Sequence, residues 1–218
     1  MAQRIEGQDF ASAAMMRLVA MGLARQGISI PVPTSPTAHV SLADKRAVLG
    51  AVLACHGPLA ILSIADAACA MAPEPVVQAL TNARDIPDLM ERWHRLERFS
   101  HGRHRVEIEQ LSPQRFRLTH RARDHGPPPS MAESLLVLGL LTILTEMTGS
   151  TDVTMKTDAG AVWRNEGKWH DAGTSQGVGS VVLTAASASR TVEVRGNNPE
   201  TDLVSRLRGR LVADPVRR

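Results

Sequence analysis

Residues 130–147 read SMAESLLVLGLLTILTEM, and the rest of the chain must pack around this segment. Ser130 followed three residues later by Glu133 is the capping-box pattern that starts a helix, and Gly149 provides a stop. Apolar side chains between Leu135 and Leu144 fall on every side of such a helix, so it must be covered all round. We expect it to be the central element of the fold. The run is too short for a membrane span, which takes about 20 residues.

The chain before this segment is predicted to be largely helical. Apolar residues recur at helical spacing, and Gly, Pro and cap residues divide them into segments. One amphipathic stripe is especially regular, with an arginine-rich opposite face: it consists of Ile86, Leu89, Met90, Trp93 and Leu96. The helices are expected at 9–26, at 41–55 with Ser41 and Asp44 as a capping pair, at 59–71, after Pro75, and from Asp85 to about residue 99.

After residue 103 the hydrophobic period changes from 3.6 to 2, which predicts a two-stranded hairpin around Ser112-Pro113. If Ile108 faces Phe116, His104 lies opposite His120 on the apolar face. The same register sets Glu109 against Arg115 and Glu107 against Arg117 on the polar face. Two buried imidazoles need hydrogen-bond partners, which are either each other and the backbone or a bound polar ligand.

The remaining chain predicts more strands and a closing helix. Strands are expected at 153–157, 178–185 and 191–195, a loop carrying Trp163 and Trp169 between the first two, and a helix at 199–212. The order of helices, hairpin, buried helix, strands and closing helix defines an α+β fold: N-terminal helices, and an antiparallel sheet packed on the central helix. A single domain is expected over residues 1–214, with residues 215–218 beginning a linker.

The amino-acid composition narrows the class of protein. The chain has 218 residues, 43% hydrophobic and 22% charged, which is enough to bury a core. It has no Tyr and six Phe and Trp, so the stacking platforms of a single-strand nucleic-acid binder are scarce. Arg4, Glu6 and Asp9 are charged residues where a signal sequence would need an apolar stretch, so no signal sequence is expected. The two cysteines, Cys55 and Cys69, are expected to be buried free thiols. These features favour a soluble, cytoplasmic protein.

Charge is unevenly distributed along the chain. From Arg92 to Arg123 nine Arg stand against three Glu, and from Arg190 to Arg218 seven Arg stand against four acids. Such a block is typical of a site for an anionic ligand, or of a sheet face and helix face that pair their own charges. Both interpretations of the Arg92–Arg123 block remain open from the sequence.

The sequence contains matches to catalytic and metal-binding motifs, but the other residues that each kind of site needs are missing. Residues 173–177 match G-x-S-x-G, but no His follows His170, so the hydrolase order Ser–Asp–His is impossible. Cys55 and His56 are adjacent on a helix and project about 100° apart. His101 and His104 have a ligand-like spacing but no companion Cys or carboxylate. No phosphate-binding or dinucleotide motif occurs. We expect no enzyme activity, no metal and no cofactor.

The sequence resembles the N-terminal effector domain of AraC-type transcription regulators, in the subgroup whose domain is arabinose-binding-like. The similarity extends over nearly the whole chain as hydrophobic patterns at 88–99, 133–144, 179–183, 190–194 and 198–199, and as the basic segment 207–218. The resemblance implies a sensor that binds a small intracellular effector, forms a homodimer and controls DNA binding by a helix-turn-helix module. That module would begin where this chain stops, at Arg218.

A ligand site is expected where polar and aromatic side chains converge on the sheet. The predicted ligand-binding residues are Trp93, His104, Arg117, His120 and Trp163. In this interpretation Arg or His anchors a carboxylate or phosphate, and Trp supplies apolar area. The alternative is a nucleotide or cyclic-dinucleotide module that uses the Arg92–Arg123 block.

Overall fold

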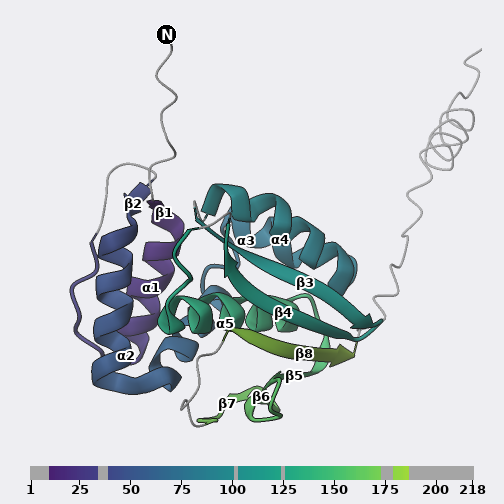
Figure 1. Ribbon diagram of the computed structural model, residues 1–218. Coiled ribbons are helices and arrows are strands. Elements are labelled where there is room, and N and C mark those ends of the chain that lie inside the picture. The colour runs from purple at the N-terminus through teal and green to yellow at the C-terminus, as the bar shows by residue number, and fades with distance from the viewer. Residues whose placement is uncertain (1–9, 34–38, 101–102, 124–125, 173–178, 187–218) are drawn as a thin grey trace, which may run out of the picture. The chain divides into compact units, whose positions relative to one another are not determined.

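Helix α5 (Met131–Met147) is the centre of the fold, as its sequence predicts. The computed structural model describes residues 10–33, 39–100, 103–123, 126–172 and 179–186 (Figure 1). The Ser130 hydroxyl accepts from the Glu133 N–H at 3.2 Å, and the Glu133 carboxylate accepts from the Ser130 N–H at 2.9 Å, so the capping box is closed. Every residue from Ala132 to Thr145 is buried. The helix ends just before Gly149, whose φ of 89° suits glycine.

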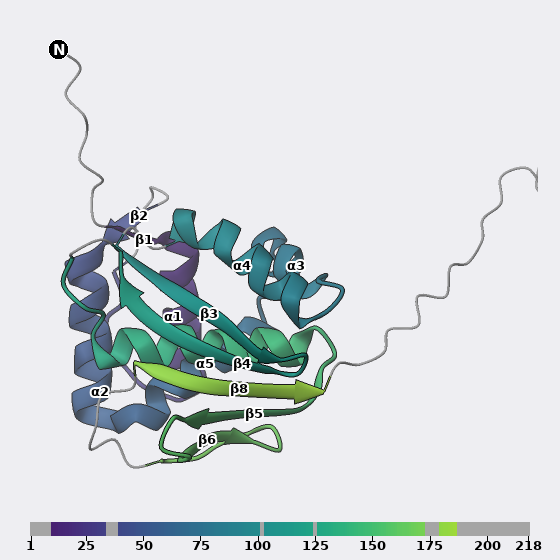
Figure 2. The ribbon, with the colours of Figure 1, turned by 45° about the vertical axis from the view of Figure 1, so that its right-hand side comes forward.

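A six-stranded antiparallel sheet packs on one side of α5 (Figure 2). The strand order along it is β3-β4-β8-β5-β6-β7, which makes β3 an edge strand. Buried residues of β4 and β8 alternate with more exposed ones, so one face of the sheet covers α5. The strands are β3 (His104–Ser112), β4 (Arg115–Ala122), β5 (Thr151–Thr157), β6 (Val162–Asn165), β7 (Lys168–Trp169) and β8 (Ser180–Ala186).

Helices cover the rest of α5, which confirms the α+β class. A small two-stranded sheet, β1 (Phe10–Ser12) with β2 (His39–Ser41), joins the starts of α1 and α2, so α1 begins after Ser12 rather than at Asp9. The helical elements are α1 (Ala13–Arg25), α2 (Leu42–Ile64), the 3-10 helix η1 (Ala65–Cys69), α3 (Pro75–Thr81) and α4 (Ile86–Ser100).

The break predicted at residues 56–58 is a kink within α2. Gly57 has φ 76° and ψ −178°, and Pro58 follows it. The segment Leu42–Cys69 is long and apolar enough to cross a membrane by length and composition alone, and 39% of its most apolar window is buried. Its buried side packs on α1 and α5.

The hairpin forms with its faces as predicted but with a different register. His104 lies opposite Ala122, Val106 opposite His120, and Ile108 opposite Leu118, a shift of two residues. The turn is tighter than expected, because a bulge between Gln110 and Ser112 brings Ser112 opposite Arg115. Because side chains alternate with period two, a two-residue shift leaves every side chain on its predicted face.

The cross-strand ion pairs change with the register. Glu109 binds Arg117 at 2.8 Å, and Glu107 binds Arg121 at 3.2 Å, in place of the predicted pairs with Arg115 and Arg117. The interpretation of this face as self-paired is confirmed for these residues.

Two further expectations differ from the structure, and three fall outside the described residues. Trp163 and Trp169 lie in strands β6 and β7 rather than in a loop. Cys55 and Cys69 are exposed rather than buried, because Cys55 lies on the outer side of α2 and Cys69 ends η1. The strand at 191–195, the helix at 199–212 and the proposed linker at 215–218 lie outside the described residues.

Candidate functional site

An apolar cavity of about 70 Å³ lies among the helices that cover α5. Five helical elements supply its wall, so no single stretch of sequence defines it. Flexible side chains dominate the lining, including two methionines, which adapt easily to a bound molecule. The principal lining residues are Met15 and Leu18 of α1, Met71 after η1, Leu80 of α3, Trp93 and Glu97 of α4, and Leu140 and Leu144 of α5.

Glu97 is the only ionisable side chain among the described residues that line this cavity. It is 2% exposed. One carboxylate oxygen accepts from the backbone N–H of Val106, and the other lies 4.0 Å from Nη2 of Arg123. Burial raises the pKa of Glu97 to about 7, although the Val106 N–H, Arg123 and the neighbouring Trp93 indole favour the charged form.

Glu97 also connects the cavity to the sheet. It accepts from Val106 on the free edge of β3, and His94 Nε2 lies 2.9 Å from the Val106 carbonyl oxygen, to which a protonated Nε2 donates. Two side chains of α4 thus satisfy both backbone groups of one edge residue. A change in the position of α4 would therefore also displace the β3 backbone at the edge of the sheet.

Glu97 is absent from the predicted ligand-binding residues, although the sequence carries a signal for it. The residue lies four positions after Trp93, and eleven after Ile86, on the apolar side of an otherwise regular stripe. A carboxylate inside an apolar stripe must find buried partners or a ligand. The lining from α1, α3 and α5 carries no such local signal, because it depends on tertiary packing.

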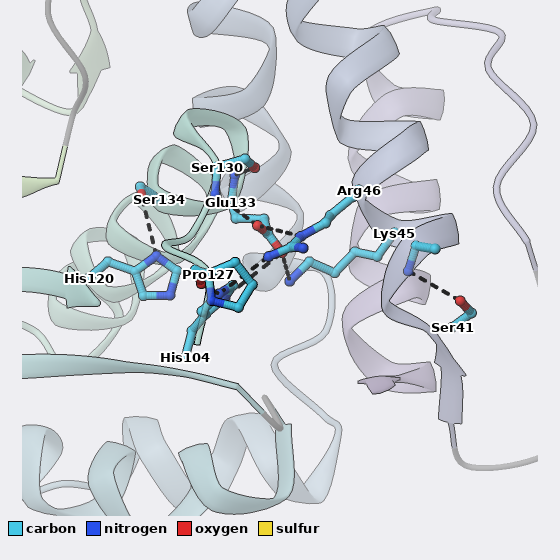
Figure 3. Close-up of polar contacts among 10 residues, drawn as sticks. Ser41, Lys45, Arg46, His104, His120, Pro127, Ser130, Glu133 and Ser134 are labelled. Carbon is cyan, nitrogen blue, oxygen red and sulfur yellow. Dashed lines mark hydrogen bonds and ion pairs between the residues drawn. The ribbon is translucent and has the colours of Figure 1, made fainter. Parts of the chain in front are cut away.

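A second buried site is a polar cluster between α2, α5 and the hairpin, shown in Figure 3. Lys45 is 1% exposed and Glu133 is fully buried. Lys45 Nζ lies 3.3 Å from one Glu133 oxygen, and Arg46 Nε lies 3.1 Å from the other. Burial alone would raise the pKa of Glu133, but Lys45, the Ser130 N–H and Arg46 together lower it to about 2. Burial lowers the pKa of Lys45.

His104 and His120 complete this polar cluster. Their rings meet edge to face with centroids 5.4 Å apart, a diagonal contact that survives the register shift. His104 Nε2 lies 3.2 Å from the Pro127 carbonyl, and His120 Nδ1 lies 3.2 Å from Ser134 Oγ (Figure 3). His120 Nε2 has no hydrogen-bond partner among the described residues. Burial, then His104, lowers the pKa of His120 to about 3, so it is neutral at pH 7.

The five predicted ligand-binding residues do not lie together. Trp93 lines the apolar cavity, whereas His104 and His120 belong to the polar cluster. Arg117 alternates with His120 onto the outer face of the sheet, where it is 41% exposed and pairs with Glu109 and Asp158. Trp163 is buried in β6, three strands away from β4. Only the two histidines touch as predicted.

Much of the Arg92–Arg123 block is engaged by acidic neighbours. Arg92 binds Asp88 at 3.0 Å and lowers the pKa of that carboxyl well below its usual range. Arg105 and Arg121 both pair with Glu107. These pairs reduce the net positive charge that a nucleotide would meet, so the nucleotide alternative gains no support here.

The metal and nucleophile patterns gain no support either. Among the described residues, no three His, Cys, Asp or Glu side chains gather as a metal site would require. Cys55 and His56 are both exposed on α2. His101 and residues 173–177 lie outside the described residues.

Comparison with known proteins adds little to this geometry. No family model matches the chain, and no curated protein matches it. Among solved structures, the chain is similar to the Fe(II) unliganded H-NOX protein from K. algicida, at 11% identity and a TM-score of 0.41, over 82% of this chain and 88% of that one. A point mutant of that protein aligns over the same shares, at 9% identity and a TM-score of 0.44. These values are too low to assign this chain to that class of protein.

Proposed function

We propose that this chain is a ligand-binding regulatory domain, and that its ligand is a small molecule held in the apolar cavity beside Trp93. The observation that carries the proposal is the cavity itself, which is lined mostly by apolar side chains and by one buried polar residue, Glu97. A concave apolar site with few convergent polar groups is the usual form of a small-molecule site.

The proposed regulatory role follows the AraC-type effector domains that the sequence resembles. A bound ligand would favour one packing of α1, α3 and α4 against α5, and so shift the population of two conformations. Control of an attached helix-turn-helix module, homodimer formation and a cytoplasmic location belong to this proposal. DNA is contacted only through that module, and the domain carries out no catalysis and uses no cofactor.

Binding can be tested with 1-butanol as a small neutral probe. The three indole N–H resonances report on three places, because Trp93 lines the cavity while Trp163 and Trp169 lie in the sheet. We expect a saturable shift of the Trp93 resonance at millimolar probe, consistent with the small free energy available from about five heavy atoms.

Two neighbouring substitutions provide the controls. Ala14 lines the cavity, so Ala14→Phe should fill it and abolish the Trp93 shift. Ala13 is similarly half-buried in the same turn and does not line it, so Ala13→Phe should leave the shift unchanged. Equal responses of the two variants, or a linear shift of all three indoles, would contradict the proposal.

A further inference from the structure

Two buried glutamates, Glu97 of α4 and Glu133 of α5, differ in their counter-charges. Glu133 has Lys45 at 3.3 Å and Arg46 at 3.1 Å, one on each oxygen. Among the described residues, Glu97 has one cation within ion-pair distance, Arg123, at 4.0 Å. A buried carboxylate needs close opposite charge to remain ionised without cost. Glu133 meets that condition within the protein, and Glu97 does not.

Arg123 cannot simply move closer to supply the missing charge. Its Nε already donates to the His104 carbonyl at 3.1 Å, and its backbone N–H bonds to the Arg103 carbonyl. The guanidinium is therefore held to the start of β3, and it is 27% exposed, so solvent screens part of its charge.

The Glu97 carboxylate also has hydrogen-bonding capacity to spare. An ionised carboxylate offers about four acceptor positions. The Val106 N–H takes one of them. Since Glu97 lines the cavity, a donor on a bound molecule can use a remaining position.

We propose that the ligand of this cavity is an apolar molecule carrying a cationic amine, and that Glu97 is the residue that recognises the amine. This inference rests on the proposed function and adds the chemical class of the ligand. An ammonium group supplies N–H donors and the positive charge that Glu97 lacks, while its alkyl part fills the space between Met15, Met71 and Leu140. An anionic effector meets an uncompensated carboxylate and is excluded, which reverses the expectation of a carboxylate or phosphate ligand.

Three probes of one shape and different charge test the inference. We would titrate n-butylamine, 1-butanol and butyrate at pH 8 and follow the Trp93 indole resonance. The inference predicts that the amine binds at least about tenfold more tightly than the alcohol, and that butyrate does not bind. An alcohol that binds as tightly as the amine would overturn the inference while leaving the proposed function intact. No saturable binding of any probe would overturn both.

A matched pair of variants locates the charge effect. Glu97→Gln should bring the amine's affinity down to that of the alcohol and leave the alcohol's affinity nearly unchanged. Glu91→Gln is the control, because Glu91 lies on the same helix, is 70% exposed and pairs only weakly with Arg95 at 3.8 Å. If both variants lower amine binding equally, surface charge rather than Glu97 is responsible. If the Glu97→Gln variant does not fold, the order of affinities of the three probes for the unmodified protein still tests the inference.

Discussion

At the residue scale, environment determines the properties of the two buried glutamates. Glu133 lies within a polar cluster that supplies two cations and a backbone N–H, so its pKa falls to about 2. Glu97 lies at an apolar cavity, and burial raises its pKa to about 7. The first is a structural ion pair that joins α2 to α5. The second leaves an interaction that a ligand can complete.

Glu97 should make stability depend on pH in an unusual direction. Between pH 4.5 and 7 the unfolded chain has released this proton and the folded protein retains it, so its contribution to stability falls as pH rises. Glu97→Gln mimics the protonated acid at every pH. We expect the variant to match the unmodified protein near pH 4.5 and to be more stable at pH 8, by up to about 3 kcal/mol.

Urea unfolding at a series of pH values measures this effect, and the difference between the two proteins cancels the opposite contributions of His104 and His120. Glu91→Gln, at a 70% exposed position of the same helix, is the control for removing a charge from α4. A Glu97→Gln protein that is less stable by the same amount at pH 5 and pH 8 would show that Glu97 is an ordinary ionised carboxylate.

At the scale of elements, the helical layer depends on one close crossing. A Cβ at Gly22 of α1 would lie 2.6 Å from the backbone Cα of Ile64 at the end of α2, so only glycine fits there. A Cβ at Gly50, on the outer side of α2, would meet nothing within 4 Å. Both glycines lie within helices, so the same substitution separates packing from helix propensity.

Gly22→Ala should destabilise the protein by about 1–3 kcal/mol or more, because the backbones of α1 and α2 must separate. Gly50→Ala should stabilise it by about 0.5–1 kcal/mol, the usual gain of Ala over Gly in a helix. Thermal unfolding of both variants provides the comparison. A neutral Gly22→Ala would mean that α1 does not cross α2 at this distance.

At the scale of the whole molecule, the features predicted correctly are those that depend on local pattern. Apolar residues on every side of 135–144 predict a central helix, and alternation in the hairpin predicts which side chains are buried. The register depends on the turn, where the bulge at Gln110 and Ser112 was not foreseeable from alternation alone. Strands β6 and β7 are four and two residues long, too short for a periodic signal.

The sequence predicts less of the candidate site than of the fold. Contact between His104 and His120 followed from their placement on one face of neighbouring strands. The cavity could not be predicted, because its lining comes from residues as far apart as Met15 and Leu144. The charge of Arg117 favours a place in the ligand site, but its position in β4 directs it to the outer face of the sheet.

Occupation of the cavity among α1, α3, α4 and α5 by a small apolar molecule can be observed as intermolecular NOEs. The experiment uses protein labelled at the methionine methyl groups and an excess of 1-butanol. We predict NOEs from the butyl chain to the methyls of Met15 and Met71, which line the cavity. NOEs confined to other methionines, such as Met155 of strand β5, or no NOEs under saturating conditions, would contradict occupation of this cavity.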